Sequence, residues 1–157
     1  MKIREIKSED KAWIKNLFIK RWAGDFIVSR RKIHRLDDLK GFIAESNNKK
    51  VGLITFGIKD KNLEIISLDS LLERRGIGST LLKKVIDYGK RKKIKRIFLT
   101  TTNDNFNALR FYQKRKFRLV KVFPNSMEFA RRLKPKIPKI SDSGVPIRDE
   151  IELEIKL

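Results

Sequence analysis

A run of two arginines, two glycines and a serine has the residue types of an anion-binding loop. Its members are Arg74, Arg75, Gly76, Ile77, Gly78 and Ser79. Ahead of a helix, such a loop offers free backbone N–H groups and the positive end of the helix dipole, which bind phosphates. Two known patterns fail, because Leu81 stands where the dinucleotide-binding pattern has its third glycine and the P-loop ending Gly-Lys-Ser/Thr is missing. Since a Gly-x-Gly pair also occurs in bare turns, the flanking elements must decide.

The flanking elements predict a strand–helix–strand unit. Residues 62–69 alternate in polarity and follow two more strand candidates, 40–45 and 50–58, across turns rich in Asn and Asp, which is typical of an antiparallel meander. After the loop comes an amphipathic helix, and residues 96–102 have the pattern of a buried strand. The stretch 62–102 is therefore a βαβ unit, in which the two strands pair in parallel.

The rest of the chain completes one domain of mixed α+β class. The other expected elements are strand 2–6, a helix capped by Ser8, a short helix or ordered loop over 25–38, a helix over 106–115 capped by Asp104 or Asn105, strand 117–123, a helix capped by Asn125, and a last strand 151–157. Prolines make residues 126–149 a helix followed by an irregular connection. We expect a single domain over 1–157, with a mostly antiparallel sheet flanked by helices.

Composition excludes several kinds of catalytic site. The 157 residues contain no cysteine, which excludes a disulfide scaffold, thiolate metal ligands and a cysteine nucleophile. His34 is the only histidine, so neither a histidine-ligated metal nor a Ser-His-Asp triad is expected, and a surface position is the simplest one for it. No apolar run approaches the ~20 residues of a membrane helix, and the charged N-terminus lacks a signal-peptide core. We therefore expect a soluble, cytoplasmic protein without a metal.

The charge is strongly positive. Lys and Arg number 39 against 19 Asp and Glu, a formal net charge of +20. Such a surface attracts nucleic acids, phosphorylated ligands and anionic membranes alike, or it serves solubility alone. It argues against a polycationic substrate. The basic cluster from Lys90 to Arg96 is most simply a solvated helix end.

The order of these features resembles the GNAT superfamily of acetyl-CoA-dependent N-acetyltransferases. The loop around Gly76-x-Gly78 resembles the end of that family's Q/R-x-x-G-x-G/A motif, and the run from Asn105 to Tyr112 resembles its N-x-x-A-x-x-x-Y motif. Glu73 departs from the first motif, and Lys116 stands where a glycine is common, but neither removes the backbone cradle. A closer likeness is to a bacterial and archaeal subgroup of the family, through the stretches Ser29–Phe42, Thr100–Asn105 and Pro146–Glu154.

The resemblance implies a site for acetyl-CoA. Strands 62–69 and 96–102 would splay apart at a bulge near Leu68–Ser70, with the pantetheine arm in the gap. The implied cofactor-binding groups are the backbones of Leu68 and Ser70, the amides of Arg74, Arg75, Gly76, Ile77, Gly78 and Ser79, and the side chain of Asn105 or Asn107. Tyr112 would give its proton to the departing thiolate, since a phenol with a pKa of about 10 can lose and regain a proton. The amine attacks the thioester directly, which suits a chain without cysteine.

The base that takes a proton from the amine has two candidates on strand 62–69. Alternation puts Glu64 on one face with Ile66 and Leu68. Asp69 falls on the other face, nearer the expected thioester. Members of the family often carry a glutamate base on this strand, which favours Glu64. A solvated carboxylate, a loop cap and a relay of waters stay as alternatives for these two residues.

The acceptor is not identified by the sequence. In this family the segment around Trp22, Arg30 and Arg31 covers the acceptor site, and arginines facing that site would indicate a carboxylate or phosphate on the acceptor. A core or surface role is the alternative for these residues. A small-molecule amine and a protein amine are both open, as is a homodimer.

A second class of function is a basic nucleic-acid- or ribosome-associated binding module on the same scaffold. The sequence has no RNA-recognition aromatic signature, KH loop or zinc finger, and its basic residues are spread over many elements. We therefore favour an N-acetyltransferase that moves an acetyl group from acetyl-CoA to a primary amine.

Overall fold

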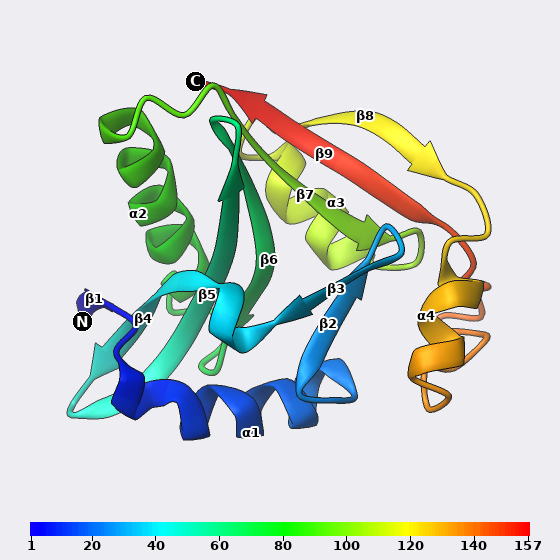
Figure 1. Cartoon of the computed structure of the whole chain (residues 1–157), viewed down its shortest axis with the longest axis horizontal. Coiled ribbons are helices and arrows are strands. Elements are labelled where there is room, and N and C mark those ends of the chain that lie inside the picture. Colours follow the sequence, from blue (N-terminus) through cyan, green and yellow to red (C-terminus); the bar gives the residue numbers. More distant parts are fainter.

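A seven-stranded sheet runs through the computed structural model, which describes residues 1–157 (Figure 1). The strands are β1 (Lys2–Glu5), β2 (Phe26–Ser29), β3 (Lys32–Arg35), β4 (Lys40–Ser46), β5 (Lys49–Lys59), β6 (Asn62–Ser70), β7 (Arg96–Thr102), β8 (Arg118–Phe123) and β9 (Glu150–Lys156). The helices are α1 (Lys11–Trp22), α2 (Ile77–Arg91), α3 (Phe106–Gln113) and α4 (Met127–Leu133). None of these helices combines the length and the apolar composition that a membrane-spanning helix needs.

The order of strands in the sheet is β1-β4-β5-β6-β7-β9-β8, and β2 and β3 form a separate hairpin. All neighbouring strands are antiparallel except β6 and β7, which pair in parallel. The C-terminal strand β9 is inserted between β7 and β8 (Figure 1). This arrangement confirms the mixed α+β class and the single parallel pair expected from the sequence.

The helices cover the sheet with separate apolar clusters. Helices α2 and α3 pack on a cluster of 17 buried residues that includes Phe42, Leu81 and Tyr112. Helix α1 buries Ile14 and Phe18 in a second cluster together with residues of β2, β4, β5 and β6. A strand between two such layers alternates its side chains between them, so β4, β5 and β6 hold the two layers together.

The hairpin β2–β3 replaces the short helix or loop expected over residues 25–38. Its turn consists of Arg30 and Arg31, with φ of 49° and 61°, the left-handed pair that a two-residue hairpin turn needs. Glycine and asparagine normally mark such turns, so the sequence did not indicate one here. Contacts with the sheet stabilise this turn. The Arg30 guanidinium pairs with Glu64 at 2.8 Å, and the backbone N–H of Arg30 donates to Glu150 at 3.0 Å.

Two expected helix caps are wrong. Ser8 begins a 3-10 turn, α1 starts only at Lys11, and the Asp10 carboxylate accepts the N–H of Lys7 at 2.8 Å. Asn125 has a φ of 57° and precedes the first turn of α4 instead of capping it. In both places a carboxylate accepts a backbone N–H ahead of the helix: Asp10, directly before α1, accepts that of Lys7, and Asp149 accepts that of Asn125 at 2.8 Å.

The parallel strands β6 and β7 diverge. They pair only over Asn62–Ile65 and Arg96–Leu99. Beyond this point β6 follows β5 and β7 follows β9. The splay expected from the resemblance is therefore present, and it opens the sheet at the carboxyl ends of two adjacent strands.

A bulge in β6 lies at Ile66. Neighbouring residues of β5 pair with Ile65 and Ser67, which leaves Ile66 without a partner. The expected position near Leu68–Ser70 is thus wrong by a few residues. The extra residue also shifts the alternation, so that Leu68 packs on the α2 and α3 cluster while Asp69 contacts α1. The grouping of Leu68 with Glu64 on one face is therefore incorrect.

Candidate active site

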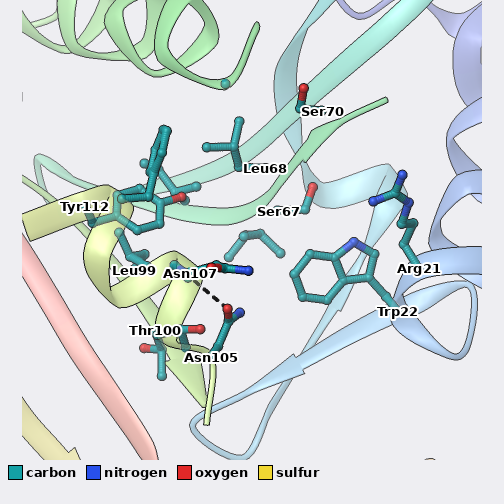
Figure 2. Close-up of a pocket in the computed structure, with 16 residues that line it drawn as sticks. Arg21, Trp22, Ser67, Leu68, Ser70, Leu99, Thr100, Asn105, Asn107 and Tyr112 are labelled. Atoms are coloured by element: carbon teal, nitrogen blue, oxygen red, sulfur yellow. Dashed lines mark hydrogen bonds between the residues drawn. The ribbon is translucent and has the colours of Figure 1, made fainter. Parts of the chain in front are cut away.

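A cavity of about 430 Å³ occupies the place where β6 and β7 diverge (Figure 2). It is bordered by β6, β7, α3, the start of α2 and the end of α1. Tyr112 and Trp22 lie on opposite sides of it (Figure 2). Six of the residues expected at the site line this cavity: Leu68, Ser70, Gly78, Asn105, Asn107 and Tyr112.

The edge of β6 that faces this cavity has free backbone groups. The ladder between β6 and β7 stops at Ile65 and Leu99, so N–H and C=O groups of the later part of β6 that point toward β7 have no strand partner. Buried backbone groups need partners, and an extended ligand with amide groups can supply them by adding to the strand. The position of Leu68 and Ser70 on this edge fits the backbone role expected for them.

The loop before α2 forms an anion cradle. Gly76 caps α2 with a φ of 69°, which glycine adopts without strain. Between Leu71 and Thr80, no backbone N–H donates to another backbone group, so the N–H groups of the first turn are free for a ligand. Arg74 and Arg75 are exposed in this loop and line no part of the cavity, while the Ile77 side chain belongs to the core. Inside the cavity, therefore, the side chains of these three residues make no contact with a ligand, whereas the exposed guanidinium groups of Arg74 and Arg75 are free at the loop surface.

Arg115 is a cation at this cradle that the sequence did not single out. Its guanidinium stacks on the Phe111 ring at 3.7 Å, donates to the Phe111 carbonyl at 2.8 Å and bonds the hydroxyl of Ser79. The charge is thus held beside the N-terminus of α2. The residue follows α3 in a run of basic side chains, so its role became visible only when α3 and α2 were placed together.

Tyr112 is a buried phenol on the cavity wall, with 5% of its surface exposed. Its ring packs edge-on against Phe111 and Phe117. Burial raises the pKa of Tyr112 above its ordinary value, the charge of Asp69 raises it further, and Arg115 opposes both. The hydroxyl is therefore protonated at neutral pH, which is the state that a proton donor requires.

Asn105 and Asn107 present amide groups to the cavity from the start of α3 (Figure 2). The Asn105 Oδ1 accepts the N–H of Ala108 at 3.1 Å and so caps the helix. This leaves its amide N–H₂ to face the cavity. Asn107 has no such capping bond, so its whole amide is available to a ligand.

Neither expected base lines the cavity. Glu64 forms an ion pair at 2.8 Å with Arg30, in the turn of hairpin β2–β3, and so lies on the face of the sheet that this hairpin covers. Asp69 is buried, and its Oδ2 accepts the indole N–H of Trp22 at 3.2 Å. Burial raises the pKa of Asp69 above its usual range, and the bond from Trp22 opposes that rise. The base role of Glu64 and Asp69 stays a prediction to which these positions lend no support.

A second cavity of about 300 Å³ adjoins the first. The two share wall residues from α1, β6, β7 and the start of α3, among them Trp22, Thr100 and Asn105. Strand β2, helix α4 and residues of the segment 134–138 line the second cavity, whereas the Arg30 and Arg31 side chains line neither cavity. The two spaces therefore meet at the splayed strands.

The hairpin side holds two further titratable residues of note. Glu150, at the start of β9, is the one carboxylate that lines either cavity, and no motif drew attention to it. His34, expected at the surface, is half-buried and bonds Ser29 through Nε2 at 2.9 Å. Burial lowers the pKa of His34, so the ring is held neutral within the hairpin.

Known proteins match most of the chain in sequence and nearly all of it in fold. Residues 5–117 match the sequence profile of the acetyltransferase (GNAT) family. The chain is 46% identical over 142 residues to the uncharacterized protein YdhI of Bacillus subtilis, covering 90% of this chain and 89% of that one. Its fold is similar to an IAA acetyltransferase from Bacillus cereus, with a TM-score of 0.73 and 19% identity over 99% of both chains. It is also similar to a GNAT family acetyltransferase from Elizabethkingia anophelis with acetyl-CoA bound, with a TM-score of 0.72 and 24% identity over 99% of this chain and 97% of that one.

Proposed function

The chain belongs to the acetyltransferase (GNAT) family, and from this membership we propose that it transfers an acetyl group from acetyl-CoA to a primary amine. The amine belongs to a small molecule or a protein. One observation carries the proposal: the cavity at the diverging strands joins a free strand edge, the open N-terminus of α2 and a buried tyrosine. A nucleic-acid module would account for the open N-terminus of α2, which binds phosphates, but for neither the free strand edge nor the buried tyrosine. All of residues 1–157 form the catalytic domain in this proposal.

The residues present fit acetyl-CoA. Free N–H groups from Arg74 to Ser79 suit its pyrophosphate, and the guanidinium of Arg115 adds a fixed positive charge. The free edge of β6 at Leu68 and Ser70 suits the amides of the pantetheine arm, and Asn105 or Asn107 adds a side-chain contact. When bound, acetyl-CoA supplies an acetyl group that is activated as a thioester.

Tyr112 acts as the proton donor. In the transfer a carbon–nitrogen bond forms, the carbon–sulfur bond breaks, the nitrogen loses a proton and the sulfur gains one. The raised pKa of Tyr112 keeps its hydroxyl protonated before the reaction. After the hydroxyl gives its proton to the departing sulfur, the strongly basic phenolate regains a proton that comes from the amine. Neither Glu64 nor Asp69 is assigned as the base, because both lie outside the two cavities.

Thermal unfolding with acetyl-CoA tests the cofactor site. A ligand at about 100 times its Kd adds about 2.7 kcal/mol to the free energy of unfolding. For a chain of this size the melting temperature should rise by roughly 5–10 °C. Pyrophosphate and ATP serve as anion controls. Equal small shifts with all of them would show only a generic response of a +20 protein, and the proposal would then fail.

A glycine variant locates the site. A Cβ on Gly78 would lie 3.6 Å from the Phe111 ring and 3.9 Å from Leu68, which are ordinary contacts, so Gly78→Ala should fold normally. Because Gly78 lines the cavity, the added methyl should reduce the thermal shift with acetyl-CoA. Gly57→Ala is the matched control, since nothing lies within 4 Å of its Cβ on β5. An unchanged shift in Gly78→Ala would place the cofactor elsewhere.

A further inference from the structure

The second cavity has mostly apolar walls and a single carboxylate. Hairpin strand β2 contributes Ile27 and Val28, and α4 contributes Met127 and Ala130. Glu150 is the only acidic residue among its lining side chains. The cavity volume of about 300 Å³ is at the lower end for small-molecule sites. Because this space shares wall residues with the first cavity at the splayed strands, a ligand here would lie next to the proposed acetyl-CoA site.

Glu150 is buried without a cation. It has 4% of its surface exposed and sits opposite Thr102 of β7 in the β7–β9 ladder. Its Oε1 accepts the backbone N–H of Arg30 at 3.0 Å. The buried hydroxyl of Ser126 lies beside the carboxylate but makes no hydrogen bond of ordinary geometry. The carboxylate therefore retains capacity for a further donor.

The next two acidic residues of β9 have the cationic partner that Glu150 lacks. Glu152 pairs with Arg96 at 3.3 Å, and Glu154 pairs with the same guanidinium. Glu150 forms no ion pair with any lysine or arginine. A buried carboxylate is costly without a cation or full hydrogen bonding. A cation supplied by a ligand would satisfy it.

The cations around this cavity do not neutralise Glu150. The Lys134 ammonium is engaged by the carbonyl oxygens of Trp22 and Phe26. Arg21 and Lys136 are exposed side chains at the rim. Burial raises the pKa of Glu150, and the negative charge of Glu64 raises it further, while the Arg30 N–H, Ser126 and the Arg30 charge oppose the rise.

We propose that Glu150 binds the ammonium group of the acceptor and takes up one of its protons, and that the acceptor is a small primary amine with an apolar body. This rests on the acetyl transfer proposed above. The apolar body packs on Ile27, Val28 and Met127, and the ammonium end pairs with the carboxylate. An ammonium that becomes an amide loses two protons: one reaches the sulfur by way of Tyr112, and the other passes to Glu150 and then to water.

Phenethylamine and benzylamine are the probes, with phenylacetate and benzyl alcohol as analogues that lack the ammonium group. Release of the thiol from acetyl-CoA measures turnover. Glu150→Gln keeps the side-chain volume and the acceptor for the Arg30 N–H but removes the charge. It should lower kcat/KM for phenethylamine by about 100-fold or more, while the thermal shift with acetyl-CoA is unchanged. Glu150→Asp keeps the charge on a shorter side chain, so its kcat/KM for phenethylamine should lie between those of Glu150→Gln and the unmodified chain.

Glu154→Gln is the matched control, because Glu154 lies on the same strand and face, pairs with Arg96 and lines neither cavity. A lower kcat/KM for phenethylamine in Glu150→Gln, with normal turnover in Glu154→Gln, supports the inference. Equal kcat/KM in both variants and the unmodified chain overturns it. A thermal shift with acetyl-CoA but no acetylation of either amine overturns this acceptor class and leaves acetyl transfer standing.

A binding measurement separates the inference from the proposed function. If acetyl-CoA gives no thermal shift, acetyl transfer itself fails, but saturation-transfer NMR with phenethylamine still examines the second cavity. Binding that is lost in Glu150→Gln and absent for benzyl alcohol supports the Glu150 site. No binding to the unmodified chain, or equal binding to the variant, overturns it.

Discussion

Two buried carboxylates of this protein, Asp10 and Glu150, have opposite surroundings. Asp10, just before α1, accepts hydrogen bonds from the Arg4 guanidinium at 2.7 and 2.9 Å and from the Lys7 N–H at 2.8 Å, and pairs with the Lys50 ammonium at 2.8 Å. Glu150 accepts one backbone N–H at 3.0 Å and has no cation. Both side chains are buried to a similar degree, so the difference lies in their partners.

The partners decide what each carboxylate does. The Arg4 guanidinium, more than any other group, holds the pKa of Asp10 well below its usual range, whereas burial raises the pKa of Glu150. A buried carboxylate with a full set of donors ties elements together. One that lacks them costs folding free energy and is available to a ligand. Burial alone therefore does not mark a functional residue, but burial without a cation or a full set of donors beside a cavity does.

The largest expected effect is on catalysis at Tyr112. Tyr112→Phe removes the proposed proton donor, so kcat should fall by about 10²–10⁴-fold. The thermal shift with acetyl-CoA should persist, because the ring and its packing on Phe111 and Phe117 are kept. Steady-state kinetics and a melt of the same preparation make the measurement. Normal turnover in the variant would show that Tyr112 is only a core aromatic.

For Asp10, the carboxylate with a full set of partners, Asp10→Ala should lower the free energy of unfolding and leave acetyl transfer unchanged. The substitution leaves Arg4 and Lys50 without their buried partner. Because both cations are partly exposed to water, we expect the free energy of unfolding to fall by about 3 kcal/mol, the lower end for a broken buried ion pair. Urea unfolding measures this loss. The control is Asp37→Ala, whose exposed pair with Lys11 at 2.6 Å should leave the unfolding midpoint nearly unchanged. Equal losses in both variants would contradict the distinct role given to Asp10.

The stability contributed by Asp10 should depend on pH. Its pKa is lower in the folded than in the unfolded chain, so the contribution is present above the unfolded value and is lost as the pH falls toward the folded one. The difference in unfolding free energy between the unmodified chain and Asp10→Ala should therefore shrink below about pH 4. Urea titrations at several pH values follow it. A difference that stays constant into acid would mean that the charge of Asp10 does not matter.

The smallest expected effect has the opposite sign. The raised pKa of Glu150 means that its ionised form is disfavoured in the folded state, so Glu150→Gln should stabilise the chain at neutral pH by about 1 kcal/mol. The gain should vanish at acid pH, where Glu150 is protonated in both states. Melts at neutral and acid pH provide the measurement. A loss of stability instead would make Glu150 a structural charge like Asp10, and the comparison would break.

Local patterns predicted much of the fold. The apolar pattern of residues 96–102 predicts a strand with the bounds that β7 has, and the neighbouring patterns predict the meander of β4, β5 and β6 and the parallel pair. The hairpin β2–β3 was missed, because Arg30 and Arg31 form a left-handed turn without the usual turn residues. The bulge at Ile66 was misplaced, because strand alternation carries no sign of one extra residue.

The two motifs of the first cavity can be recognised in the sequence, because each depends on residues a few positions apart within one loop and the helix beside it. Gly76, Asn105 and Tyr112 owe their positions to such short-range geometry. The second cavity, in contrast, depends on long-range packing. Strand β9 enters between β7 and β8, and Glu150 meets the Arg30 N–H across 120 positions of the chain. Local spacing carries no information about such a pairing, because it forms when a strand from the end of the chain is inserted into the sheet.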